Sequence, residues 1–152
     1  MSYFRVLRGV AIGKSYISPG ALTKGMAVQE KSGFPDQIEP GGNNSVGFVI
    51  QNVLTDGIPF EIQNAGIPID DVPISQAVAV RSGEGEIVTD RVLVSGTGNL
   101  PGATVNASLA LNNGLWRVAQ TGDVVWGKLR EKDFGGTTGL YRIETFKTAV
   151  TV

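Results

Sequence analysis

The chain has 152 residues, a length that suits one domain or two small intertwined halves and can bury a core without disulfides. It contains no Cys and no His, which excludes disulfides, thiolate metal sites, Cys nucleophiles and most catalytic sites built on imidazole. Its 13 basic residues are balanced by 14 acidic ones and do not cluster along the sequence, so the sequence predicts no nucleic-acid binding.

The chain is also poor in charge for a protein in water. Charged residues make up 18% of it, below the usual share of roughly a quarter, while 21 residues are Gly and 7 are Pro. So much uncharged surface indicates that a partner or further copies of the chain cover part of it. We therefore expect a homo-oligomer.

Residues 1–20 begin with mixed basic and apolar residues, but the apolar run of a signal peptide does not follow. No stretch of the chain approaches the roughly 18 apolar residues of a transmembrane helix. We expect no membrane partner, and a mature chain that starts here and folds in a cytoplasm. This segment is either an arm that packs on a neighbour or an ordinary first strand, and the strand is slightly favoured.

Within this segment, Gly13-Lys14-Ser15 resembles the end of a phosphate-binding loop. That motif requires Gly where Arg8 stands, and no helix can follow, so we expect a bend at this place. The Gly- and Pro-rich residues 34–44 predict a long exposed loop.

No stretch of ten or more residues has the composition of a helix, and the remaining segments are typical of short strands. Leu140 begins the longest stretch without Gly or Pro, and its Thr, Val and Ile favour a strand. The strands expected from these patterns are residues 45–54, 58–63, 76–81, 86–95, 123–130 and 140–152.

The clearest local signal is a hairpin at Asn113-Gly114, a dipeptide that suits a tight type I′ turn. Apolar and mostly polar residues alternate over 105–112, which predicts a strand with one apolar face. A two-residue turn places Leu111 opposite Trp116 and Leu109 opposite Val118, so the apolar faces of both strands coincide. Trp116 is therefore expected in the core.

Residues 65–98 connect two stretches that share a weak pattern, 21–64 and 99–146, so the β domain over 21–152 is interpreted as two related halves. The prolines of 67–74 predict an extended edge or loop. The glycines of 96–102 lack the spacing of a dinucleotide motif and predict a loop between strands. The predicted fold class is all-β, a small antiparallel barrel or sandwich with an extended N-terminal segment and a Pro-rich loop.

The sequence predicts no catalytic residue, no cofactor and no metal site. Apolar side chains on the N-terminal segment, in the loops and on both faces of 123–130 are instead candidates for an interface. These candidates are Tyr3, Phe4, Val6, Leu7, Phe34, Ile67, Ile69 and Trp126.

Two segments carry a resemblance to a known family. Residues 20–28, Gly-Ala-Leu-Thr-Lys-Gly-Met-Ala-Val, followed by 46–50, Val-Gly-Phe-Val-Ile, resemble the capsid-decorating, or cement, proteins of tailed bacteriophages. Residues 103–105 and 125–127 resemble a second pass of the same pattern, so the resemblance covers about residues 20–132. The Pro-rich connection and the longer N-terminus depart from the compact members.

This resemblance implies a structural virion protein that is made in the host cytoplasm and binds the outer face of the assembled capsid. Its partner is then the major capsid protein, trimers are favoured, and the bound copies stabilise the lattice. Such a protein has no active site.

Two other functions stay open. One is another assembly part of a phage, such as a tail-tube, head-fibre or adhesin domain. The other is a carbohydrate-binding or carbohydrate-active module, which as an enzyme needs two carboxylates in one cleft, about 5 to 9.5 Å apart. Its candidate carboxylates are Asp36, Glu39, Asp70, Asp71, Glu84 and Glu86.

Overall fold

The computed structural model of the chain describes residues 4–9, 12–54, 71–73, 77–82 and 85–151. Within these ranges every regular element is a strand apart from one short 3-10 turn, η1 (Phe134–Gly136). The prediction of an all-β fold is therefore confirmed. No helix in the described ranges has the length and apolar character needed to cross a bilayer.

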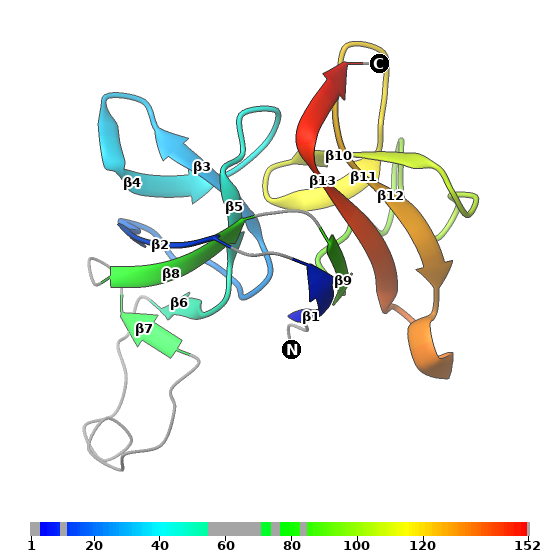
Figure 1. Cartoon of the computed structure of the whole chain (residues 1–152), viewed down its shortest axis with the longest axis horizontal. Coiled ribbons are helices and arrows are strands. Elements are labelled where there is room, and N and C mark those ends of the chain that lie inside the picture. Colours follow the sequence, from blue (N-terminus) through cyan, green and yellow to red (C-terminus); the bar gives the residue numbers. More distant parts are fainter. Residues whose placement is uncertain (1–3, 10–11, 55–70, 74–76, 83–84, 152) are drawn as a thin grey trace.

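The first layer is a six-stranded sheet, in which every neighbouring pair is antiparallel. It forms the right half of Figure 1. In spatial order its strands are β1 (Phe4–Gly9), β9 (Gly85–Thr89), β13 (Tyr141–Thr151), β12 (Val124–Lys132), β10 (Ser108–Asn112) and β11 (Leu115–Val118).

The second layer is a small closed barrel in the left half of Figure 1. The barrel closes where Ile17 pairs with Gln37 in parallel, and its other ladders are antiparallel. Its strands, in order around the barrel, are β2 (Ile12–Ile17), β4 (Phe34–Pro40), β3 (Ala27–Lys31), β5 (Gly47–Val49) and β8 (Ala77–Ser82). A separate parallel pair joins β6 (Asn52–Leu54) to β7 (Asp71–Pro73).

The hairpin at Asn113-Gly114 has the predicted register. Leu111 pairs with Trp116 and Leu109 pairs with Val118. Both turn residues have positive φ, 50° at Asn113 and 81° at Gly114, as a type I′ turn requires. The local pattern of the sequence was sufficient here because hydrophobic alternation and turn chemistry specify the same pairing.

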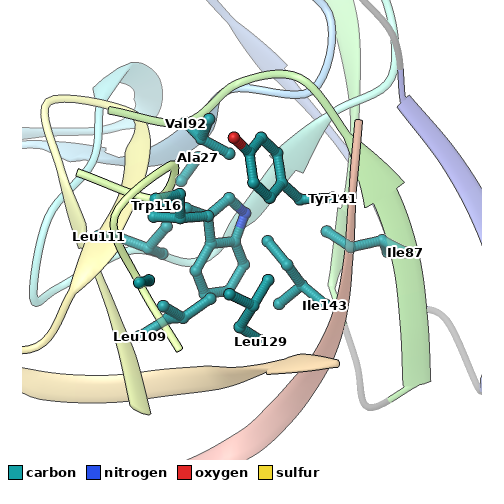
Figure 2. Packing of buried hydrophobic residues seen from close by; sticks show 11 residues of the cluster. Ala27, Ile87, Val92, Leu109, Leu111, Trp116, Leu129, Tyr141 and Ile143 are labelled. Carbon is teal, nitrogen blue, oxygen red and sulfur yellow. The ribbon is translucent and has the colours of Figure 1, made fainter. Parts of the chain in front are cut away.

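Trp116 is fully buried and lies at the centre of the core of the six-stranded sheet, as expected (Figure 2). The opposite wall contains Gly127 on β12. A Cβ at Gly127 would lie 3.1 Å from the Trp116 ring and 2.6 Å from the Glu144 carbonyl oxygen. Glycine at this position therefore makes room for the indole.

A second core fills the barrel, and β3 contributes to both cores. Ala27 packs in the core around Trp116, whereas its neighbour Val28 packs in the barrel core with Ile38 and Val49. This division follows from strand geometry, since successive side chains point to opposite faces.

Hydrogen bonds and aromatic rings join the two layers. Gly114 donates its N–H to the Gly41 carbonyl at 2.8 Å and accepts from the Ala27 N–H at 3.1 Å. Phe48 of β5 stacks on Trp116 at 5.6 Å and on Phe4 of β1 at 5.8 Å between ring centroids. The hairpin turn is thus hydrogen-bonded to the barrel.

Two expectations near the N-terminal half were wrong. Residues 34–40 form strand β4 instead of an exposed loop, because β3 pairs with Phe34 and with residues 38–40, while Pro35 lies at the irregularity of this ladder. Gly13-Lys14-Ser15 lies inside the extended strand β2 and pairs with β8, so no bend occurs there. The described part of the N-terminal segment thus forms strands β1 and β2.

Other boundaries differ from the predicted ones. Residues 45–54 divide into β5 and β6 around a bend at Ile50, and the strand expected over 86–95 ends at Thr89. Val105 is exposed, because strand β10 begins only at Ser108. The strand expected over 58–63 lies outside the described residues, as does most of the Pro-rich segment, of which Asp71–Pro73 forms β7. The relation between the two halves stays a prediction.

We expect Gly127→Ala to lower the free energy of unfolding by ~1–3 kcal/mol, because the added methyl group meets backbone and the indole ring. Gly20→Ala is the matched control, since a Cβ there has no neighbour within 4 Å. Urea unfolding monitored by tryptophan fluorescence measures both. Equal midpoints for the two variants would contradict the packing role of Gly127.

The phenol of Tyr141 is buried in the core around Trp116. Burial raises its pKa above the usual 10.0, and the negative charge of Asp133 raises it further. The folded protein therefore holds this proton more tightly than the unfolded chain does, so stability is lost as pH rises above about 10. We expect Tyr141→Phe to show a smaller difference in urea midpoint between pH 7 and pH 11. The same difference in the wild type and the variant would contradict this assignment.

Candidate interaction surface

The structure describes the side chains of only some of the predicted interface residues, so the interface itself stays a prediction. Tyr3, Ile67 and Ile69 lie outside the described residues, and Val6 is placed only by its pairing with Ile87 in the β1–β9 ladder. Phe4 and Trp126 are half-buried and pack against the core around Trp116, and Leu7 is also half-buried. Phe34 remains.

Phe34 stands where β4 begins, next to the turn that follows β3, and its side chain is 53% exposed. Lys31 pairs with it across the hairpin, and the Lys31 ammonium lies 5.6 Å from the ring centroid. This cation–π contact orients an exposed aromatic side chain.

A different surface segment has the most unusual composition. No charged residue occurs between Arg91 and Arg117. The hairpin fills the end of this stretch, and residues 93–107, here named the neutral loop, run mostly over the surface. Val94, at 67%, is the most exposed large hydrophobic side chain of the described chain, and Val105 is 50% exposed.

The neutral loop is anchored to the sheet by its apolar residues and its backbone. Leu100 and Ala103 are buried in the core around Trp116. The Leu93 N–H donates to the Trp116 carbonyl at 2.8 Å, and the Val118 N–H donates to the Gly98 carbonyl at 2.8 Å. The loop therefore lies alongside β11, whose position is set by the core.

Polar side chains fix the turns of the neutral loop. The Asn99 amide nitrogen donates to the Gly96 carbonyl, and its oxygen accepts from the Gly102 N–H, both at 2.8 Å. Lys132 donates to the carbonyls of Pro101 and Ala103 at 2.7 and 3.0 Å. These bonds hold a segment without regular structure in one conformation.

The far end of the loop is held from β12. Arg130 donates to the Asn106 side-chain oxygen at 2.6 Å and also forms an ion pair with Glu144 at 2.8 Å. Asn106 adopts a positive φ of 75°, which Asn tolerates better than most residues, and the next residues lead into β10. This turn directs Val105 to the surface instead of along the predicted strand.

An open cleft of about 350 Å³ lies along the neutral loop. Its walls carry no charged side chain, and only amide and hydroxyl groups provide polar contacts from side chains. The lining residues are Gly98, Asn99, Gly102, Ala103, Thr104, Ala107, Val118 and Gln120. The chemistry of this surface is therefore apolar contact and neutral hydrogen bonding, without a group that titrates near neutral pH.

None of the candidate carboxylates that the structure describes lines this cleft. Asp36 and Glu39 lie on β4 of the barrel, whereas Glu86 lies on β9 of the sheet and pairs with Arg142 at 3.0 Å. Asp70 and Glu84 lie outside the described residues, and Asp71 is described only by its backbone in β7. Among the described residues no three of His, Cys, Asp or Glu gather as metal ligands do.

Comparison with protein-family models, with curated proteins and with solved structures finds no match to this chain.

We expect Asn99→Ala to loosen the neutral loop without unfolding the protein. The variant loses the bonds to Gly96 and Gly102, so amide hydrogen exchange at Gly102 becomes faster and stability falls by ~1 kcal/mol. Asn112→Ala, at an exposed position before the hairpin turn, is the matched control. Unchanged exchange at Gly102 in Asn99→Ala would contradict the anchoring role.

Proposed function

We propose that this chain is a non-enzymatic assembly protein that decorates the capsid of a tailed bacteriophage. It is made in the host cytoplasm, associates with itself, with trimers favoured, and binds the major capsid protein on the outer face of the shell. The neutral loop is the observation that carries the binding role, because it presents exposed valines and an uncharged cleft on a rigid frame.

The positions of the two family-like segments support the more specific part of the proposal. Residues 20–28 lead into β3, residues 46–50 contain β5, and these two strands are paired through Ala27 with Phe48 and Val28 with Gly47. Residues 103–105 and 125–127, the second pass, lead into segments that are hydrogen-bonded to each other. The Asn106 N–H donates to the Leu129 carbonyl, and the Leu129 N–H donates to the Ala107 carbonyl. In both passes the similar segments are neighbours in space or lead directly into neighbours.

In the proposed role, the strength of binding depends on the interface area summed over many bound copies. A single small interface gives weak binding, but subunits that bind as an oligomer to a repeating lattice gain from effective concentration. Each bound copy that bridges neighbouring capsid subunits then stabilises the shell, in the way that any ligand stabilises the state it binds.

The test is co-sedimentation of the purified protein with expanded capsids that lack it, assembled from the major capsid protein of the same genome. We expect saturable binding to expanded shells and a higher temperature of shell disruption. Procapsids and free capsid subunits serve as controls. If the protein fails to bind expanded capsids, the proposal is wrong. Rings or fibres formed by the isolated protein in electron micrographs would favour a tail or fibre component.

A further inference from the structure

We propose that Asn113 is a deamidation site that the fold keeps unreactive, and that it reacts when the barrel and the six-stranded sheet separate at the hairpin turn. The two backbone hydrogen bonds that connect Gly114 to Gly41 and to Ala27, here named the hairpin joint, are the protecting contact. The site is independent of the proposed function, because it depends only on contacts within the chain.

The turn has the sequence that this reaction needs. Asn113 precedes Gly114, and this is the one Asn-Gly pair in the sequence. In such a pair the backbone nitrogen of the glycine can attack the side-chain amide of the asparagine, because glycine has no Cβ to obstruct the approach. Asn113 is exposed, so water and hydroxide reach its side chain. The group that is attacked therefore lies at the surface.

The reaction has two steps, and water is its only co-reactant. The Gly114 nitrogen loses its proton to hydroxide and forms a bond to Cγ of Asn113. The bond between Cγ and Nδ2 breaks, and the nitrogen takes a proton from water and leaves as ammonia. Water then opens the five-membered succinimide ring at either of its two carbonyl groups. The product at this position is an aspartyl side chain or an isoaspartyl linkage, in which the backbone runs through the former side chain.

In the folded protein the attacking nitrogen is occupied. The Gly114 N–H donates to the Gly41 carbonyl at 2.8 Å, and Gly114 is buried although Asn113 is exposed. A buried and hydrogen-bonded N–H is shielded from hydroxide, and its nitrogen cannot turn toward Cγ of Asn113 while the bond persists. The Gly114 carbonyl is also held, because it accepts the Ala27 N–H at 3.1 Å. The hairpin joint thus fixes this glycine on both sides.

The turn fits closely against β3, so the product cannot take its place. A Cβ at Gly114 would lie 2.7 Å from Cε of Met26 and 3.2 Å from the Ala27 carbonyl oxygen. Positive φ angles at Asn113 and Gly114 make this tight turn possible. An isoaspartyl linkage adds a methylene group to the backbone of a two-residue turn. We therefore expect the isoaspartyl product to leave the hairpin joint open.

The rate of deamidation then measures how often the hairpin joint opens. Only the open form reacts, so the observed rate is the rate in the unfolded chain multiplied by the fraction of molecules that are open. Loss of ammonia makes each event permanent. Modified molecules therefore accumulate with the time that the joint has spent open.

The first experiment compares full-length protein in mildly alkaline buffer with the same protein unfolded in urea. Peptide mass mapping follows conversion at Asn113. We expect the folded protein to react at least ~10-fold more slowly, because the hairpin joint must open first. Equal rates in the two samples would show that the fold gives no protection and would overturn the proposal.

Two serine variants test whether the hairpin joint is the protecting contact. The buried Ser45 hydroxyl donates to the Gly42 carbonyl at 2.7 Å and so holds the turn that presents Gly41. Ser18→Ala is the matched control, since its buried hydroxyl donates to the Gly20 carbonyl at 2.6 Å outside the hairpin joint. We expect Ser45→Ala to deamidate ~5-fold faster than the wild type, and Ser18→Ala to react like the wild type. Circular dichroism checks that both variants fold, and equal rates for them would exclude local opening at the joint.

Hydrogen exchange of the wild type gives a readout that needs no variant. The Gly114 N–H that exchanges with solvent is the same group that must be freed for the attack. We expect the fold to slow exchange at Gly114 and deamidation at Asn113 by the same factor, within about threefold. Exchange at Gly114 as fast as in the unfolded chain would overturn the proposal. The purified isoaspartyl product should unfold at a lower urea concentration, and a wild-type midpoint would contradict the open joint.

Discussion

The constraint on which the structure most depends is that β3 serves two hydrophobic cores at once. Ala27 faces the core of the six-stranded sheet and Val28 faces the barrel core, and both are fully buried. A one-residue shift in the register of β3 would exchange these two side chains and disturb both cores. The Gly114 hydrogen bond to Ala27 then joins the hairpin to this same strand. Phe48 adds to the link, because it pairs with Ala27 in the barrel and stacks on Trp116.

This link determines where the neutral loop lies. Trp116 is held by its ring in the core and by its backbone, which bonds to Arg91 and Leu93 on either side of Val92. The chain that leaves Leu93 therefore starts from a fixed point, and Leu100 and Ala103 bring it back to the same core. A loop with two buried anchors and a side chain such as Asn99 bonded across its turn has few alternative conformations. The rigidity of the exposed face is thus a consequence of the buried aromatic cluster.

The sequence predicted the parts of this arrangement that depend on neighbours along the chain. The hairpin register and the burial of Trp116 followed from alternation and turn chemistry, which act over a few residues. Strand β4 could not be recognised in this way, because Phe34-Pro35-Asp36 is a poor strand sequence. It becomes one because β3 lies on one side of it and β2 closes the barrel on the other. Closure of a barrel brings together segments that local patterns do not connect.

The candidate surface was missed for a related reason. The sequence pattern extended the strand of β10 back to Val105 and so placed this valine on a buried face. The chain instead turns at Asn106, whose positive φ and bond to Arg130 depend on a residue far along the chain. The informative signal was the absence of charge between Arg91 and Arg117, which is a property of composition and needs no knowledge of the fold.

The absence of charge between Arg91 and Arg117 can be interpreted only when the structure shows which of these residues are buried and which are exposed. An uncharged stretch is ordinary inside a core, and Leu109, Leu111 and Trp116 account for the end of this one. Charge is equally absent over residues 94–97 and 104–106, which are exposed, and solvation alone would favour ionic side chains there. The charges next to this uncharged segment come from β12, where Lys132 donates to the carbonyls of Pro101 and Ala103 and Arg130 donates to the side chain of Asn106.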